Sequence, residues 1–503
     1  MNDIQFTLGQ GGLGSIAPGQ DYISGYLIYS NTIPSGFTTS TAKLITSLNQ
    51  AVSYGILGDY SDETKATAVL VAGATGSVGD IVTINISEPA VGGGVNIVSI
   101  PYVRQTSDTT STLLATDVSN AINASGTGYT STATGATISV SARPGMGASL
   151  NSGSPISIVE SGTAAVTVSS QFTGGVASKK IEWYYQISEF FRNAPNATLY
   201  VAFYPTGDTS FADITDMQAQ AGGNMRQLMV TSTSTTTAQM LLDVAYIQIQ
   251  ASQLQTQQIP LSVLYSNNLF GTSDLSTLPN LRTQTANYVS VVIGQDAGGQ
   301  GAWLSLTMGR AITAIGACLG TIAQSNVEED IAWTQFNISD GIEDETVGFM
   351  NGQAYKFSNV SIYNQIDNYG YIFLRKFANK TGSYWNDSHC CIVITSDYAY
   401  IERNRVIGKA QRGTYADLFP LLNGPVGFNK DGTIDNTTIA KFEGAPMPTL
   451  NTMQSNGEIS AYSVTVDTIS NVQQTGILNI SILIVGVGVA RHIKVLLGYT
   501  KSI

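Results

Sequence analysis

The residues best suited to chemistry stand next to one another in the stretch Ser388-His389-Cys390-Cys391. A thiol beside a histidine is used in nucleophilic catalysis, and cysteine together with histidine also binds zinc. Zinc ligands normally come as spaced pairs, however, and two adjacent cysteines with one histidine do not complete a tetrahedral site. A nucleophilic pair needs a third, orienting group, which the sequence does not identify. The pattern therefore favours the start of a buried strand over an active site.

Three other kinds of stretch have the composition of ligand sites but lack positions that such sites require. The run GGQG at 298–301 precedes a predicted helix without the Lys-Ser/Thr pair of a phosphate-binding loop. The run DGTID at 431–435 lacks the alternating acids and the terminal glutamate of a calcium loop. The acidic clusters at 328–330 and 343–345 have no neighbouring group that would position a substrate. We therefore predict no catalytic residue, no cofactor and no metal ion, and an α/β enzyme built on the cysteine–histidine stretch is the least favoured function.

A short basic run is the most unusual charge feature of this acidic chain, which has 23 Lys and Arg against 35 Asp and Glu. Four basic residues fall within positions 403–412. On a helix, Arg405, Lys409 and Arg412 have the spacing i, i+4, i+7 and share one face. The apolar residues expected on the opposite, buried face are Ile407, Ala410 and Leu418. The run therefore predicts either a solvated helix face or a cationic surface for an acidic partner.

Length and composition favour a large protein that packs against copies of itself. At 503 residues, the chain is long enough for two to four domains. Charged residues make up only 12%, about half the usual fraction, and small or polar uncharged residues replace them. Such a surface suits contacts between identical subunits. The net charge of −12 argues against nucleic-acid binding.

Cysteine use and hydropathy indicate where the protein is made. Its three cysteines do not form a disulfide framework, which fits synthesis in a reducing cytoplasm. The first residues, MNDI, lack the basic and apolar regions of a secretory signal. No apolar run reaches the ~18 residues that cross a membrane, so we expect no membrane insertion.

Hydrophobic periodicity predicts a mixed α/β fold. After position 179, helices alternate with strands, which is typical of an α/β layer with a largely parallel sheet. Apolar residues at helical spacing predict one long helix over 303–318. Pro446 and Pro448 are expected to exclude a long helix after position 439 and to keep the chain mostly irregular up to a predicted strand at 461–466.

Shifts in composition divide the chain into five segments. Residues 64–178 are nearly uncharged and rich in Gly, Ala, Ser, Thr and Val, with a pattern typical of short strands around one helix. This segment is predicted to be a β-rich domain inserted into the main fold at its surface. The other segments are an extended N-terminal arm (1–30), the start of the core (31–63), an α/β domain (179–345) and a C-terminal domain that ends in a strand arm (346–503).

Two regions of the sequence resemble the contractile tail sheath proteins of bacteriophages. The first is the basic run with the residues that follow it, RNRVIGKAQRGTYADLFPLLNGPV at 403–426 and DGTI at 431–434, which resembles the C-terminal core of these proteins. The second is WYYQISEFFRNAPNATLYVAFYP at 183–205. These stretches cover a modest part of the chain, and they occur in the order expected for the family, with a variable region before them.

The resemblance implies a structural protein of the virion tail. Sheath protomers stack as hexameric rings around an inner tail tube, and they contract to drive the tube through the host envelope during genome delivery. The implied partners are other copies of the chain, the tail tube protein, and the baseplate and tail terminator proteins. The sheath of a bacterial contractile injection system is an alternative that the residues do not separate from a phage sheath. A tail fibre or adhesin that displays segment 64–178 is a less favoured alternative.

The resemblance also suggests roles for the basic run and for the chain ends. Arg405, Lys409 and Arg412 are predicted to face an acidic stripe on the tail tube. Apolar strands at the two ends are predicted to form a sheet shared between subunits, because backbone ladders between chains resist pulling along the tail. The residues assigned to this strand exchange are Ile4, Phe6, Leu8, Ile480, Ile482, Ile484, Val489 and Ile493.

Overall fold

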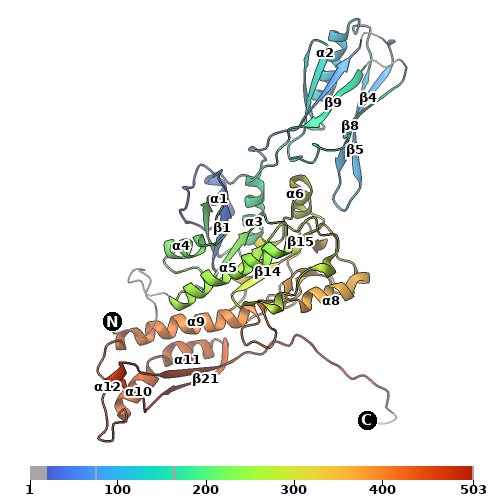
Figure 1. Cartoon of the computed structure of the whole chain (residues 1–503). Helices are drawn as coiled ribbons and strands as arrows, with labels where there is room; N and C mark the ends of the chain where they lie inside the picture. Colours follow the sequence, from blue (N-terminus) through green and yellow to red (C-terminus); the bar gives the residue numbers. More distant parts are fainter. Residues whose placement is uncertain (1–19, 74–75, 163–165, 501–503) are drawn as a thin grey trace.

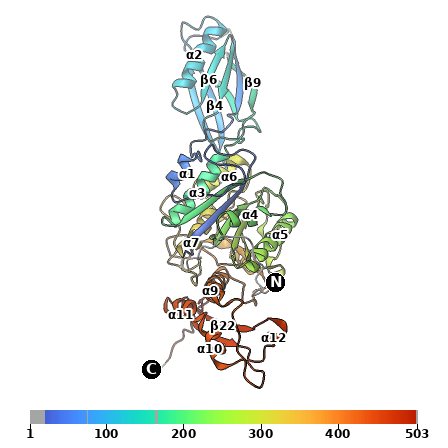
Figure 2. The same ribbon diagram turned by 90° about the vertical axis from the view of Figure 1, so that its left-hand side faces the viewer.

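The computed structural model describes residues 20–73, 76–162 and 166–500. Figure 1 shows three units along one axis: the inserted segment at one end, an α/β unit in the middle and the C-terminal elements at the other end. Figure 2, turned by 90°, shows the same order of units. Helices and strands both contribute to several units, so the predicted mixed α/β, multidomain fold class is confirmed.

A seven-stranded sheet forms the centre of the α/β unit. Its strands, in spatial order, are β17 (Tyr371–Ile372), β14 (Val289–Val292), β12 (Ser262–Ser266), β11 (Gln227–Thr231), β1 (Ile23–Tyr29), β10 (Thr198–Tyr204) and β2 (Lys43–Ile45). All neighbours are parallel except β2, which pairs antiparallel with β10 at the edge. Strands covered on both faces are apolar without alternation, and the sequence TLYVAFY of β10 follows this rule.

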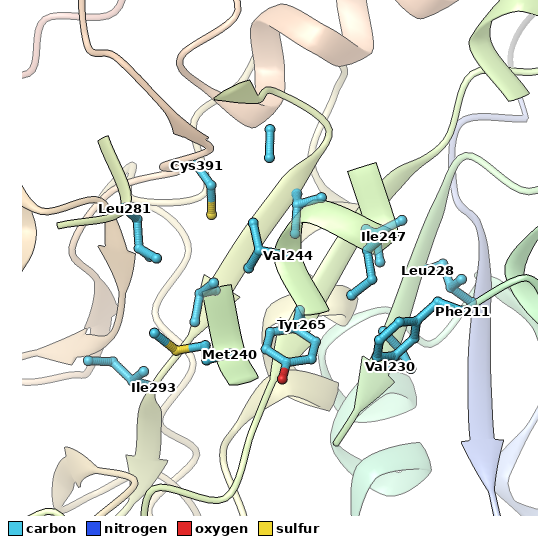
Figure 3. Packing of buried hydrophobic residues seen from close by; sticks show 14 of the residues in the cluster. Phe211, Leu228, Val230, Met240, Val244, Ile247, Tyr265, Leu281, Ile293 and Cys391 are labelled. Carbon is cyan, nitrogen blue, oxygen red and sulfur yellow. The ribbon is translucent and has the colours of Figure 1, made fainter. Parts of the chain in front are cut away.

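Helices cover both faces of this sheet and create two hydrophobic cores. The helices α3 (Lys180–Asn193) and α7 (Ile315–Gln324) pack on one face, and α4 (Asp213–Gln220) and α5 (Thr237–Thr256) pack on the other. Figure 3 shows the second core, in which apolar side chains of α5 meet those of β11 and β12. Because successive side chains of a strand point to opposite faces, Tyr26 of β1 belongs to the first core and Leu27 to the second.

The strand β1 is central to the sheet and is not part of an N-terminal arm. It lies between β10 and β11 and is mostly buried. Gly25 has no room for a side chain, because a Cβ there would lie 2.5 Å from Met225 Sδ and 2.6 Å from Leu228 Cδ1. The predicted arm 1–30 is therefore wrong over 20–30, because its strand partners are distant in sequence. Residues 1–19 lie outside the described residues.

The single helix predicted over 303–318 is in fact two helices, α6 (Gln300–Met308) and α7. Gly309 ends α6 in the left-handed conformation, with a φ of 65°, which glycine adopts at little cost. The apolar pattern continues through this break, so periodicity did not reveal it. The helix α7 then approaches α3 closely at Gly316, where a Cβ would overlap the backbone carbonyl oxygen of Gln186.

The substitution Gly316→Ala is expected to lower the free energy of unfolding by about 1–3 kcal/mol, because the added methyl group meets backbone at the α3–α7 contact. Chemical denaturation of the purified protein measures this change. The matched control is Gly444→Ala at the end of α10 (Asn436–Gly444), where a Cβ meets open space. The control is expected to change stability by less than about 1 kcal/mol. Equal stability of the two variants would contradict the close contact between α3 and α7.

The inserted segment forms a unit with its own core. One sheet has the order β6 (Thr130–Thr134), β7 (Thr137–Ser141), β3 (Thr67–Ala72) and β9 (Val166–Thr173), and the other has the order β5 (Val95–Val103), β4 (Ile81–Pro89) and β8 (Ile156–Glu160). The helix α2 (Ser111–Ala124) packs on these strands and is capped by Thr110. A bridge between Thr64 and Val176 closes the neck of the unit. This neck lies close to the ends that composition assigned to the insertion.

The C-terminal unit begins at α9 (Ile401–Leu418), later than the predicted position 346, because β17 still belongs to the central sheet. After α9 follow α10, α11 (Met447–Ser455), β21 (Ile459–Val466), α12 (Val472–Thr475) and β22 (Ile480–Gly486). Residues 440–455 are thus largely helical, and the prediction of an irregular chain there is wrong. Pro446 precedes α11 and Pro448 lies in its first turn, where proline is compatible with a helix.

The remaining elements are short. They are α1 (Leu48–Ser53), α8 (Val360–Asn368), β13 (Thr285–Ala286), β15 (Gly294–Asp296), β16 (Val347–Phe349), β18 (Leu374–Arg375), β19 (Tyr384–Trp385), β20 (Cys391–Ile392) and the 3-10 helices Leu275–Thr277, Leu281–Thr283, Phe357–Asn359 and Phe419–Leu421. Within the described ranges, no helix combines the length and the apolar character needed to span a membrane.

Candidate assembly interface

The helix α9 lies between the α/β unit and the C-terminal unit (Figures 1 and 2). Val406 and Ala410 belong to the core of the C-terminal unit. Two of the basic side chains are also buried, since Arg405 is 6% exposed and Arg412 is 9% exposed, whereas Ile407 is 36% exposed. The predicted orientation of the helix is therefore wrong, because units on both sides of α9 bury the face that carries the cations.

Lys409 and Arg412 bind carboxylates within the chain. Asp21 Oδ2 lies 2.8 Å from Lys409 Nζ, and Asp21 Oδ1 lies 3.0 Å from Arg412 Nη2. Lys409 Nζ also lies 2.6 Å from Glu458 Oε1. Burial alone would raise the pKa of Asp21, but the neighbouring cations hold this pKa below its ordinary value. Asp21 thus links the start of β1 to α9 and, through Lys409, to the residue before β21.

Arg405 is also bound inside the protein. Its guanidinium donates hydrogen bonds to the Ser325 hydroxyl at 2.8 Å and to the backbone carbonyl oxygens of Ser325 and Asn326 at 3.1 and 3.0 Å. Burial, followed by the nearby charge of Arg226, lowers the pKa of Arg412 to about 9. The prediction that the three cations face a tail tube is therefore wrong, because buried groups with internal partners do not form an outer contact surface.

The strands β21 and β22 form a two-stranded antiparallel sheet at the end of the molecule. One face packs on the C-terminal core through Ile480, Ile482 and Ile484, and the other face exposes Leu483 and Val485. Among the described residues, no further strand pairs with this sheet, so each strand has an open edge. The three isoleucines assigned to strand exchange thus serve the hairpin of their own chain in this structure.

The chain leaves β22 as an exposed segment that runs away from the rest of the molecule (Figure 1). Leu496 is 100% exposed and Leu497 is 93% exposed. Ile493 is exposed as well, whereas Val489 is half-buried. Ile4, Phe6 and Leu8, the other residues assigned to strand exchange, lie outside the described residues. An apolar segment and an open sheet edge are complementary surfaces, because strand addition satisfies both.

Arg491 is held tightly where this segment begins. Its Nε lies 2.9 Å from Asp387 Oδ1, and its Nη2 lies 2.7 Å from Glu402 Oε1 and 3.1 Å from Asp330 Oδ2. The guanidinium also lies 3.6 Å from the ring centroid of Tyr400. We call Asp330, Asp387, Glu402 and Tyr400 the acidic socket. Sequence reasoning missed Arg491, although an arginine within the apolar run VGVARHIKVLL was a sign of a specific partner.

Three carboxylates around one arginine make the acidic socket sensitive to pH. Burial, followed by the charges of Asp387 and Glu402, raises the pKa of Asp330 to about 8. The folded protein therefore keeps a proton that the unfolded chain releases at the ordinary pKa of 3.8. Because the folded state binds this proton more tightly, the free energy of unfolding falls as the pH rises from about 4 to about 8 and levels off above that.

The substitution Asp330→Asn is expected to remove this fall, because an amide keeps the shape of the protonated carboxyl group without titrating. The variant should melt at the wild-type temperature near pH 4 and above it at pH 9, because the unfolded wild type releases its proton above the ordinary pKa of 3.8. Circular dichroism during heating at both pH values measures the difference. Asp431→Asn, in an exposed turn, is the control and should match the wild type at both values. Parallel pH profiles for wild type and Asp330→Asn would show that Asp330 does not hold the proton.

The cysteine–histidine stretch has a structural position in this fold. Cys391 begins β20, which pairs with β13, and both adjacent thiols are buried. Burial raises the pKa of Cys390 to about 12, so this thiol stays protonated at neutral pH, unlike a reactive thiolate. His389 Nε2 lies 3.0 Å from Asp367 Oδ1. In the parts of the chain that the structure describes, no group of three or more His, Cys, Asp or Glu side chains is placed to hold a metal ion.

A cleft of about 660 Å³ lies where the inserted unit meets the carboxyl ends of β1, β10 and β11. Ligands of open α/β sheets usually bind at this end of the strands. Much of the polar lining consists of Ser and Thr residues. Arg310 on the wall pairs with Glu182, and Asp243 accepts a hydrogen bond from the Tyr265 hydroxyl at 2.5 Å. These charged groups already have partners inside the protein, and their arrangement indicates no particular reaction.

Comparison with known protein families shows that two domain models of one family match the chain. The family model described as "DUF2586, N-terminal domain" matches residues 144–389. The family model described as "DUF2586, C-terminal domain" matches residues 397–503. No curated protein matches the chain. The boundary between the two matches falls just before α9, where the structure also passes from the α/β unit to the C-terminal unit. The chain carries both domains and belongs to the DUF2586 family, whose function is not known.

Proposed function

We propose that this chain is the protomer of a contractile tail sheath, which stacks as hexameric rings around a tail tube and contracts to drive the tube through a host envelope. One observation carries the proposal: an exposed apolar C-terminal segment follows a two-stranded sheet whose outer edges are unpaired among the described residues. Each subunit is thereby both a donor and an acceptor of a strand.

A donor and an acceptor on one chain lead to a repeating assembly. A head-to-tail contact between identical subunits closes into a ring or continues as a helix, and a tail sheath contains both arrangements. Strand addition contributes backbone hydrogen bonds, and each aliphatic side chain that it buries contributes about 1.5–3 kcal/mol. Left exposed, the same segment favours aggregation, so a bound partner is the expected state in the virion.

Two further features support a structural role. Only 12% of the residues are charged, which lowers the cost of packing surfaces together. The inserted unit lies at the end of the molecule opposite to the C-terminal unit (Figure 1). Contacts made through the C-terminal unit would therefore leave the inserted unit exposed, as expected for a domain on the outside of a sheath.

The proposed partners are other copies of the chain, the tail tube protein, and the baseplate and tail terminator proteins. The proposal includes no catalytic step, since contraction uses the free-energy difference between two packings of one subunit. Contact with the tube has to use residues other than the three cations of α9, because these have internal partners.

Electron microscopy of the purified full-length protein tests the proposed function. Tubes built from stacked rings are expected, and their amount should rise steeply with protein concentration. Discrete trimers would favour a fibre or adhesin, and monomers at every concentration would contradict a sheath. A sheath of a bacterial injection system would also form tubes, and the genes next to this one distinguish it from a phage sheath.

A further inference from the structure

Arg491 lies at the junction between the β21–β22 hairpin and the exposed C-terminal segment. The strand β22 ends at Gly486, and the residues VGVA at 487–490 connect it to Arg491. This link has no regular secondary structure, and a glycine within it allows many chain directions. The direction in which the segment leaves the subunit therefore has to be set by contacts outside the link.

The acidic socket supplies such contacts from a different unit. Asp330 follows α7, and Asp387 lies between β19 and β20, so both belong to the α/β unit. Tyr400 and Glu402 lie at the start of α9. Arg491 thus ties the last part of the C-terminal unit back to the α/β unit across α9.

The geometry of the acidic socket is specific for a guanidinium. Arg491 Nε lies 2.9 and 3.0 Å from the two carboxylate oxygens of Asp387. Its Nη2 lies 2.7 Å from Glu402 Oε1 and 3.3 Å from Ser388 Oγ. A planar fork of donors makes these contacts together, whereas the compact ammonium of lysine does not.

We propose that the acidic socket fixes the root of the C-terminal segment at Arg491 before assembly, so that only the residues after Arg491 move to a neighbouring subunit. The identity of that partner, a second copy of this chain, rests on the proposed sheath function, whereas the anchoring is a property of the single chain. The anchoring also limits how far the C-terminal segment can extend toward a neighbouring subunit. The twelve residues 492–503 span at most about 40 Å when extended, so the receiving sheet edge has to lie within that distance of the socket.

Limited digestion of the monomer with trypsin tests the anchoring. Trypsin cleaves after Arg491 and after Lys494, and only the first of these side chains lies in the acidic socket. Because proteolysis follows the population in which a site is open, cleavage after Arg491 is expected to be at least about tenfold slower than cleavage after Lys494. Mass spectrometry of the shortened chains gives the ratio of the two cleavage rates, after Lys494 and after Arg491. A synthetic peptide of residues 485–500 gives the same ratio in the absence of the acidic socket. Equal ratios for protein and peptide would overturn the proposal, whether or not the protein forms tubes.

A variant of the acidic socket provides the second arm of this test. Asp387→Asn combined with Glu402→Gln keeps the shape of the socket and removes two charges. Cleavage after Arg491 is expected to rise toward the ratio of the peptide, while cleavage after Lys494 stays unchanged. A wild-type ratio in this variant would contradict anchoring by the carboxylates.

The role of the anchor in assembly is measured separately. Arg491→Gln and Arg491→Lys are expected to keep a cooperative thermal transition and to raise the protein concentration needed for tubes at least about tenfold. Lys430→Gln, at an exposed lysine in the turn after α9, is the control and should assemble like the wild type. Tubes at the wild-type concentration from Arg491→Lys would overturn the role in assembly, even if Arg491→Gln fails to fold. Slow cleavage after Arg491 in a protein that never forms tubes would count against the sheath function and would leave the anchoring intact.

Discussion

Replacing Lys409 and Arg412 together by glutamate is expected to abolish the cooperative thermal unfolding of the protein. Asp21 and Glu458, which now bind these cations, would face two more carboxylates in a buried position. Removing one partner of a buried ion pair typically costs about 3–5 kcal/mol, and charge reversal adds repulsion. Because a folded domain is stable by only about 5–15 kcal/mol, the double variant is expected to lose most of its stability. Circular dichroism during heating measures the transition.

The matched control reverses cations that have exposed side chains. Arg403→Glu and Lys430→Glu are expected to melt within a few degrees of the wild type, because exposed charges contribute about 0–1 kcal/mol each. A folded Lys409→Glu/Arg412→Glu protein with a wild-type transition would show that the cations are free to face a partner, as the helical spacing had predicted. Asp21→Asn offers an independent check, since it removes the shared carboxylate and is expected to destabilise the fold as well.

For the proposed sheath function, deleting residues 492–503 is expected to leave a folded protein that does not form tubes. The apolar side chains of residues 492–500 are exposed, so they contribute little to the fold of their own chain. In an assembly, burial of several aliphatic side chains would contribute about 1.5–3 kcal/mol each, and every 1.4 kcal/mol is a factor of ten in affinity. Loss of the segment is therefore expected to raise the concentration needed for assembly by several orders of magnitude. Sedimentation and electron microscopy measure assembly, and calorimetry measures the fold.

Smaller changes separate the apolar contribution from the length of the segment. Leu496→Ser with Leu497→Ser is expected to weaken assembly strongly, whereas Lys494→Ala keeps the apolar side chains and should have a small effect. Normal tubes from the deletion variant would mean that another surface connects the subunits. A deletion variant that melts at a much lower temperature would mean that the segment belongs to the fold.

The sequence by itself determined those features that depend on neighbouring residues. The alternation of apolar helices and strands after position 179 was enough to predict a largely parallel α/β sheet, because periodicity is a local property. The change in composition at 64–178 marked a unit that has its own core, since a domain has to bury its apolar residues within itself. A thiol stretch without spaced ligands was correctly expected at the start of a buried strand.

The tertiary structure alone decided which surfaces meet. Cations at i, i+4 and i+7 have the same spacing on a solvated face and on a face buried between two units, so the sequence did not separate these cases for α9. Asp21, the partner of Lys409 and Arg412, is distant in sequence, as are the carboxylates around Arg491. The central position of β1 also depends on residues that are distant in sequence, because its neighbours β10 and β11 come after the whole inserted unit in the chain. Long-range pairing depends on how complete elements pack, and local residue patterns carry no information about the partner that an element finds.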